Sequence, residues 1–139
     1  MREPPEGRLD TPVFFLDRNL GHEDVAAALR ARGACVEEHD RHFPRNAPDH
    51  AWLPEVGRRG WAVITQDTRI RYRSAERVAA ETAKVALFVF TGKKMRGVEI
   101  GAAIAAALPK MVRMLGKQRR PFIARVSRSG EVTIIGHTR

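Results

Sequence analysis

A chain of 139 residues has the length of one domain, and its single cysteine, Cys35, excludes an intrachain disulfide. The 25 basic and 16 acidic residues give a formal net charge of +9, and no apolar run approaches the roughly 20 residues of a membrane helix. The excess charge is confined to residues 93–139, because residues 1–92 hold equal numbers of acidic and basic side chains. This segregation favours a nucleic acid as partner, ahead of a membrane surface or an acidic protein. We expect a cytoplasmic protein, free of membranes, in which Cys35 is a buried apolar residue.

The first 92 residues alternate between strand and helix patterns. Residues 1–11 are polar, with two prolines, and predict a disordered extension. Apolar runs at 12–17, 34–39, 61–66 and 85–90 have the length of strands, and helical patterns at 22–33, 49–60 and 74–84 lie between them, the second with Asp49 as its N-cap. The run 85–90 has no polar face, as expected at the centre of a parallel sheet covered by helices. The alternation predicts a three-layer, Rossmann-like α/β domain with a central, mostly parallel sheet.

A basic helix and a hairpin are predicted for the last third of the chain. In residues 97–118 apolar side chains recur every three or four positions, and basic side chains recur roughly opposite them. The basic residues, which we expect to contact nucleic acid, are Lys110, Arg113, Lys117 and Arg120. Pro109 should kink this helix or begin a second one, and residues 121–136 form two strands around a Ser-Arg-Ser-Gly turn. We expect one domain over 12–139, with an α/β core at 12–92 and the basic helix and hairpin at 93–139.

Three aspartates occupy comparable places in the predicted sheet. Asp17 ends the first strand, Asp67 follows the third, and Asp49 opens the helix that leads into the third. With right-handed crossovers, all three loops lie at the same edge of a parallel sheet. Carboxylates gathered there repel one another unless a cation neutralises them, and a hard divalent ion with oxygen ligands does so. Each aspartate also has an ordinary alternative role, as a helix cap, a turn residue or a solvated charge.

The stretches "FFLDRNLG", "APDHAW" and "WAVITQDTRIR" resemble the PIN-like domain, and among its members the VapC-type toxins. The resemblance covers residues 12 to about 90. It implies a Mg²⁺- or Mn²⁺-dependent endoribonuclease, the toxin of a toxin–antitoxin pair, with three catalytic metal ligands: Asp17, Asp49 and Asp67. It also places Thr65 beside the metal and Asn19 near the site. Many PIN-like domains have a fourth acidic residue; here the candidates are Glu76 and Glu99, both on predicted helices where a surface role is the alternative.

The segment after the third strand carries Arg69, Arg71 and Arg73. Alternate residues of an extended segment point the same way, so these arginines could contact RNA phosphates beside the metal. The resemblance implies RNA and a cognate antitoxin as partners and allows a homodimer. The competing hypotheses are a catalytically degenerate PIN-like or receiver-like module that binds nucleic acid or an acidic protein, and a basic nucleic-acid-binding protein with an incidental acidic edge.

Overall fold

The computed structural model describes residues 12–20, 23–67 and 82–136, with the side chains at 49 and 50 outside the description. The predicted extension 1–11 and most of the predicted helix 74–84 lie outside the described residues. The strands are β1 (Val13–Leu16), β2 (Cys35–Glu38), β3 (Ala62–Thr65), β4 (Ala86–Phe90), β5 (Phe122–Val126) and β6 (Val132–Gly136). The helices are α1 (Glu23–Ala31), α2 (Asp49–Arg58) and α4 (Gly97–Lys117), with 3-10 turns η1 (Arg18–Leu20) and η2 (His39–Arg41).

The strands form one sheet in the order β2-β1-β3-β4-β5-β6. All neighbouring pairs are parallel except β5 and β6, which form the antiparallel hairpin that the sequence predicts. Parallel pairing of β1 with β3 sets Leu16 opposite Ile64, so these two strands end at the same edge of the sheet. The prediction of a central, mostly parallel sheet is confirmed.

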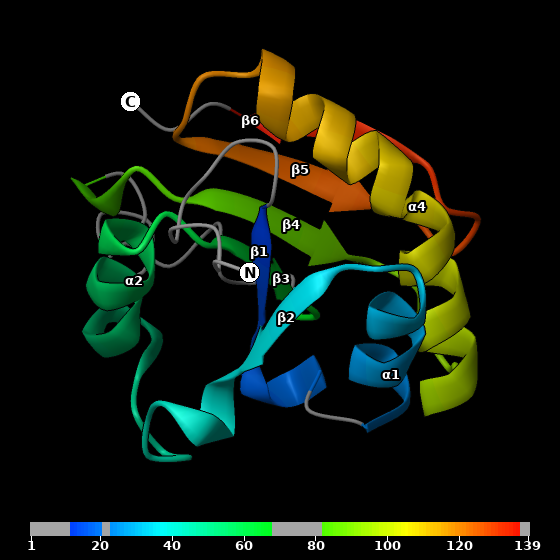
Figure 1. Ribbon diagram of the computed structural model, residues 1–139, viewed down its shortest axis with the longest axis horizontal. Helices are drawn as coiled ribbons and strands as arrows, with labels where there is room; N and C mark the ends of the chain where they lie inside the picture. The colour runs from blue at the N-terminus through cyan, green and yellow to red at the C-terminus, as the bar shows by residue number, and fades with distance from the viewer. Residues whose placement is uncertain (1–11, 21–22, 68–81, 137–139) are drawn as a thin grey trace, which may run out of the picture.

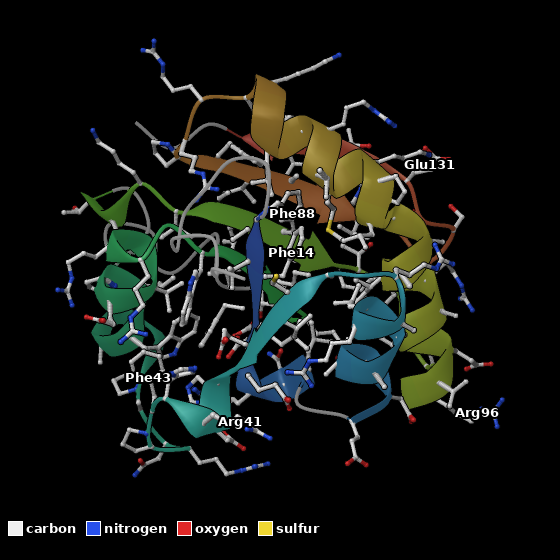
Figure 2. The ribbon with its side chains drawn as sticks, in the orientation of Figure 1. Phe14, Arg41, Phe43, Phe88, Arg96 and Glu131 are labelled. Atoms are coloured by element: carbon white, nitrogen blue, oxygen red, sulfur yellow. The ribbon has the colours of Figure 1, made fainter. Side chains whose placement is uncertain are left out.

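Helices cover both faces of the sheet and give the predicted three layers. One face carries α1 and α4, which lie side by side, and the other carries α2 (Figure 1). Successive residues of a strand point to opposite faces. Phe14 therefore packs with Phe88 under α1 and α4 (Figure 2), with ring centroids 6.4 Å apart. Phe15 packs instead on Trp52 of α2, with ring centroids 5.1 Å apart. The two cores together hold β1, β3 and β4 in the centre of the molecule.

The long helix α4 packs closely on α1. At Gly101 a Cβ atom would lie 2.8 Å from the carbonyl oxygen of Asp24, so glycine permits the close approach of the two helices. The chain stays in one helix through Pro109, which excludes the prediction that this proline begins a second helix. In the β5–β6 turn, Gly130 adopts a φ of 86°, a conformation that glycine reaches without steric cost.

Two local predictions are wrong. Cys35 is exposed, because it is the first residue of β2, the edge strand of the sheet. Asp49 is the first residue of α2, and Pro48 occupies the N-cap position with extended backbone angles and no side-chain cap. Within the described part of the chain, no helix is long and apolar enough to cross a membrane.

Candidate functional site

Asp17 is a buried carboxylate at the carboxyl end of β1. Its backbone N–H donates to the carbonyl of Ile64 at 3.0 Å, which continues the pairing of β1 with β3 by one residue. The residue is only 2% exposed. One carboxylate oxygen accepts from the backbone N–H of Arg18 at 2.6 Å, and the other accepts from the hydroxyl of Thr65 at 2.8 Å. Hydrogen bonds to an ionised carboxylate offset part of the cost of removing it from water.

Thr65 connects the ends of β1 and β3. It is the last residue of β3 and is fully buried. Its Oγ1 donates to Asp17 at 2.8 Å and accepts from the backbone N–H of Asp67 at 3.1 Å. A hydroxyl has one proton, so the 2.8 Å bond to Asp17 takes precedence over the 3.5 Å approach to Asn19 Oδ1. A single side chain therefore fixes both the carboxylate of Asp17 and the backbone that carries Asp67.

Asn19 forms a second side-chain link between the loop after β1 and the loop after β3. It lies in η1, directly after Asp17, and is exposed. Its Oδ1 accepts from the backbone N–H of Gln66 at 3.1 Å. The loops after β1 and β3 are thus joined by side-chain hydrogen bonds from both sides. This arrangement brings together four of the predicted site residues: Asp17, Asn19, Thr65 and Asp67.

A cleft of about 620 Å³ opens at this edge of the sheet. Its described walls come from three places: η1, the end of β3 and the segment after β4. The lining residues are Arg18, Asn19, Gln66, Asp67, Phe90, Thr91, Gly92, Lys93 and Lys94. Three of them are cations and one is an acid, so an anion entering the cleft meets a surplus of positive charge.

Arg18 connects the cleft to the start of α2. Its guanidinium donates to the carbonyl of Ala47 at 2.9 Å, two residues before α2 begins at Asp49. The backbone that leads to Asp49 is therefore held beside the loop after β1. The side chain of Asp49 lies outside the description, so its predicted role beside Asp17 and Asp67 stays a prediction.

The remaining acidic candidates are placed differently. Glu99 belongs to the first turn of α4, where its Oε1 accepts from the backbone N–H of Arg96 at 2.8 Å in a capping box. Figure 2 shows Arg96 at this end of α4. Glu99 is absent from the described lining of the cleft and has the alternative, structural role. Glu76 and the three arginines Arg69, Arg71 and Arg73 lie outside the described residues.

The predicted basic stripe on α4 divides into two parts. Lys110, Arg113 and Lys117 line a groove of about 260 Å³ between α4 and β6, where Lys110 also pairs with Glu131 at 2.9 Å. Arg120 lies beyond the end of α4 and donates to the carbonyl of Gly60 at 3.0 Å. Burial lowers the pKa of its guanidinium, although an arginine remains charged at neutral pH. Arg120 is therefore not part of the groove, which corrects the prediction of a four-residue stripe.

Sequence reasoning did not predict that Lys93, Lys94 and Arg18 line the cleft. Lys93 and Lys94 follow β4 as Asp67 follows β3, so the rule that functional residues gather at the carboxyl ends of parallel strands could have found them. The count of charges along the sequence instead grouped both lysines with the basic helix and hairpin of residues 93–139. No sequence pattern pointed to Arg18, because the backbone carbonyl to which it donates lies far along the chain, at Ala47.

The donor atoms of the site match a hard divalent cation in kind. Carboxylate, hydroxyl and amide oxygens are the ligands that Mg²⁺ and Mn²⁺ prefer, and Asp17, Asp67, Thr65 and Asn19 supply them at one edge. Among the residues that the structure describes, no three His, Cys, Asp or Glu side chains are grouped to hold a metal. A complete ligand set therefore needs a further residue, for which Asp49 and Glu76 are the candidates from the sequence.

Comparison with known proteins gives one result. A family model described as a PIN like domain matches residues 12–92, the stretch that contains β1 to β4 and the cleft residues up to Gly92. No curated protein and no solved structure matches the chain.

Proposed function

The chain belongs to the PIN-like domain family, and on that premise we propose that it is a metal-dependent endoribonuclease of the VapC toxin type. PIN-like domains are generally nucleases. The observation that carries the proposal is the hydrogen-bonded unit of Asp17, Thr65 and Asp67, which lies beside a cleft whose described lining holds three cations and one acid. The cations of the cleft would attract a polyanionic substrate, and the carboxylates would bind a metal cation.

The proposed cofactor is Mg²⁺ or Mn²⁺, which PIN-like nucleases usually use. Asp17, Asp67 and, by the resemblance, Asp49 would hold it, with Thr65 and Asn19 as neighbours. When bound, such an ion supplies Lewis acidity and makes a water molecule nucleophilic at neutral pH.

The residues of the chain itself have separate roles in this proposal. Thr65 holds the Asp17 carboxylate in one orientation through its 2.8 Å hydrogen bond. Arg18 holds the start of α2 toward the site through Ala47. The cations position RNA by contacting its phosphates, which fixes the substrate without reading its sequence. They comprise the three arginines of 69–73 and the groove residues Lys110, Arg113 and Lys117.

The test is cleavage of a mixed-sequence RNA with Mn²⁺, with and without EDTA. We expect cleavage only with the metal, and the Asp17→Asn and Asp67→Asn variants should lose more than the roughly 10–100-fold that outer-shell partners typically cost. The Asp17→Asn side chain keeps an oxygen that can accept from Arg18, so the variant should fold as wild type does. Glu55→Gln is the matched control, because Glu55 lies in the second half of α2, pairs with Arg58 and Arg59, and is absent from the described lining of the cleft.

Three outcomes would contradict the proposal. Cleavage that survives EDTA, or full activity of Asp17→Asn, would exclude the metal mechanism. RNA binding without cleavage under any metal would favour the degenerate binding module. The toxin assignment has its own test: induction of the wild-type chain in a bacterial host should arrest growth, and induction of Asp17→Asn to the same protein level should not.

A further inference from the structure

The segment after β4 is built to present two lysines to the cleft. Its first residue, Thr91, donates its backbone N–H to the carbonyl of Val126 on β5 at 3.0 Å, which anchors the base of the segment to the sheet. Gly92 is buried, and a Cβ atom there would lie 2.8 Å from the ring of Phe90 and 2.6 Å from the sulfur of Met95. A larger residue at this position would require the side chains of Phe90 and Met95 to shift.

Lys93 and Lys94 follow this turn and are both exposed on the wall of the cleft. Lys94 has a φ of 57°, and the backbone bends at this residue before α4 begins. Within the described part of the chain neither lysine forms an ion pair, in contrast to Lys110, which is paired with Glu131. Their charges are thus available to a ligand.

The same cleft is also lined by Asp67. It comes from the loop after β3, whereas the lysines come from the loop after β4, the next strand of the sheet. An anion bound to the lysines therefore lies next to the carboxylate edge. The α4 groove is a separate cavity whose described lining shares no residue with the cleft.

We propose that Lys93 and Lys94 form the phosphate-binding wall of the cleft and hold the backbone of a single RNA strand in the cleft that Asp67 also lines. The proposal rests on the proposed ribonuclease function and names the residues that seat its substrate. Lysine is a point charge on a flexible stem, so the two side chains bind phosphate without a fixed geometry and without discriminating bases. The two lysines then contact the phosphate backbone whatever the base sequence of the strand.

The experiment measures binding in EDTA, so that the strand stays intact. The probe is a fluorescein-labelled, single-stranded RNA of mixed sequence, and its anisotropy is followed across a series of salt concentrations. Each phosphate contact contributes roughly 0.7 to the slope of log K against log salt on single strands, so Lys93→Gln with Lys94→Gln should lower the slope by about 1.4. At 0.1 M salt the same term corresponds to an affinity loss of about 25-fold. Replacing both lysines by arginine should restore the slope, because the charge is kept.

Lys84→Gln is the matched control. Lys84 is also exposed and also has a φ of 57°, but it precedes β4 and lies at the opposite edge of the sheet. Its replacement should leave the slope unchanged. Circular dichroism melts of each variant check the fold. If the double glutamine variant is unstable, the single variants Lys93→Gln and Lys94→Gln decide the question, because each should lower the slope by about 0.7.

The outcomes separate this inference from the ribonuclease assignment. An unchanged slope in the Lys93→Gln, Lys94→Gln variant would overturn the phosphate wall even if the wild-type chain cleaves RNA with Mn²⁺. A slope lowered by about 1.4 supports the wall, and it does so even if no cleavage is found, in which case only the nuclease assignment fails. A lowered slope for DNA of the same length but not for RNA would overturn the choice of RNA as the ligand.

Discussion

The hydroxyl of Thr65 should stabilise the protein more than its methyl group does. Thr65→Val keeps the size and shape of the side chain but removes the Oγ1 that donates to Asp17 at 2.8 Å and accepts from Asp67 at 3.1 Å. Thr65→Ser keeps the hydroxyl and removes the methyl group. Because Thr65 is fully buried and Asp17 is 2% exposed, water has little access to replace the lost partner.

The magnitudes follow from these two hydrogen bonds. A bond to a charged group contributes about 1.5–3 kcal/mol and a neutral one about 0.5–1.5 kcal/mol, so Thr65→Val should destabilise by roughly 2–4 kcal/mol. Loss of one buried methyl group costs about 1 kcal/mol, which sets the expectation for Thr65→Ser. At roughly 3–5 °C per kcal/mol for a domain of this size, the melting temperature should fall by about 6–20 °C for valine and by a few degrees for serine.

Urea unfolding in EDTA measures both free energies without a contribution from metal binding. The same valine substitution in the Asp17→Asn background should cost less, because the carboxylate that needed the hydroxyl is gone, and the double-mutant cycle gives the coupling energy. Equal stability of the valine variant and wild type, or a serine variant weaker than the valine variant, would refute the reasoning. A coupling energy near zero would show that Thr65 stabilises the fold without acting on Asp17.

Three further expectations test the packing and the basic surface. Gly57→Ala in α2 should destabilise by about 1–3 kcal/mol in urea melts, because its Cβ would lie 2.5 Å from the backbone oxygen and the Cβ of Ala83, before β4. Gly116→Ala in α4 has open space and should gain up to about 1 kcal/mol of helix propensity. Arg113→Gln with Lys117→Gln should lower the RNA salt slope by about 1.4, and an unchanged slope with lost affinity for an acidic partner protein would instead assign the groove to that partner. Arg120→Gln should leave the slope unchanged and reduce stability, since its guanidinium is bonded to a backbone carbonyl; a lowered slope would return Arg120 to the RNA-binding surface.

The layers of the fold were predictable because hydrophobic periodicity depends on local geometry. Apolar runs of strand length and amphipathic helical runs occur at the positions where β1 to β4 and α1, α2 and α4 form. The same reasoning placed Asp17 and Asp67 at one edge, since both follow a buried strand. It could not supply the hydrogen bond from Thr65 to Asp17, which joins residues 48 positions apart in the sequence.

The errors have identifiable physical causes. The prediction extended the basic stripe to Arg120 because this residue continues the helical spacing, but α4 ends at Lys117. Helical backbone is disfavoured at a residue that precedes a proline, and Arg120 precedes Pro121. Cys35 has an apolar neighbourhood in sequence, but burial on an edge strand depends on what covers it, which composition does not reveal. Dividing the chain by charge separated Lys93 and Lys94 from the cleft that they line.

The position of the cleft follows from the strand order alone. The chain runs from β1 to β2 on one side and places β3 on the other side of β1, so the connections leave the sheet in opposite directions between β1 and β3. Crevices in parallel sheets form at such a reversal, outside the carboxyl ends of the strands. Asp17 and Asp67 follow the two strands at this point, and Thr65 closes the gap between them. Because the backbone topology creates the crevice, substitution of the carboxylates should remove the chemistry and leave the cleft in place. Asp17→Asn and Asp67→Asn should therefore still bind RNA, with the salt slope that Lys93 and Lys94 provide.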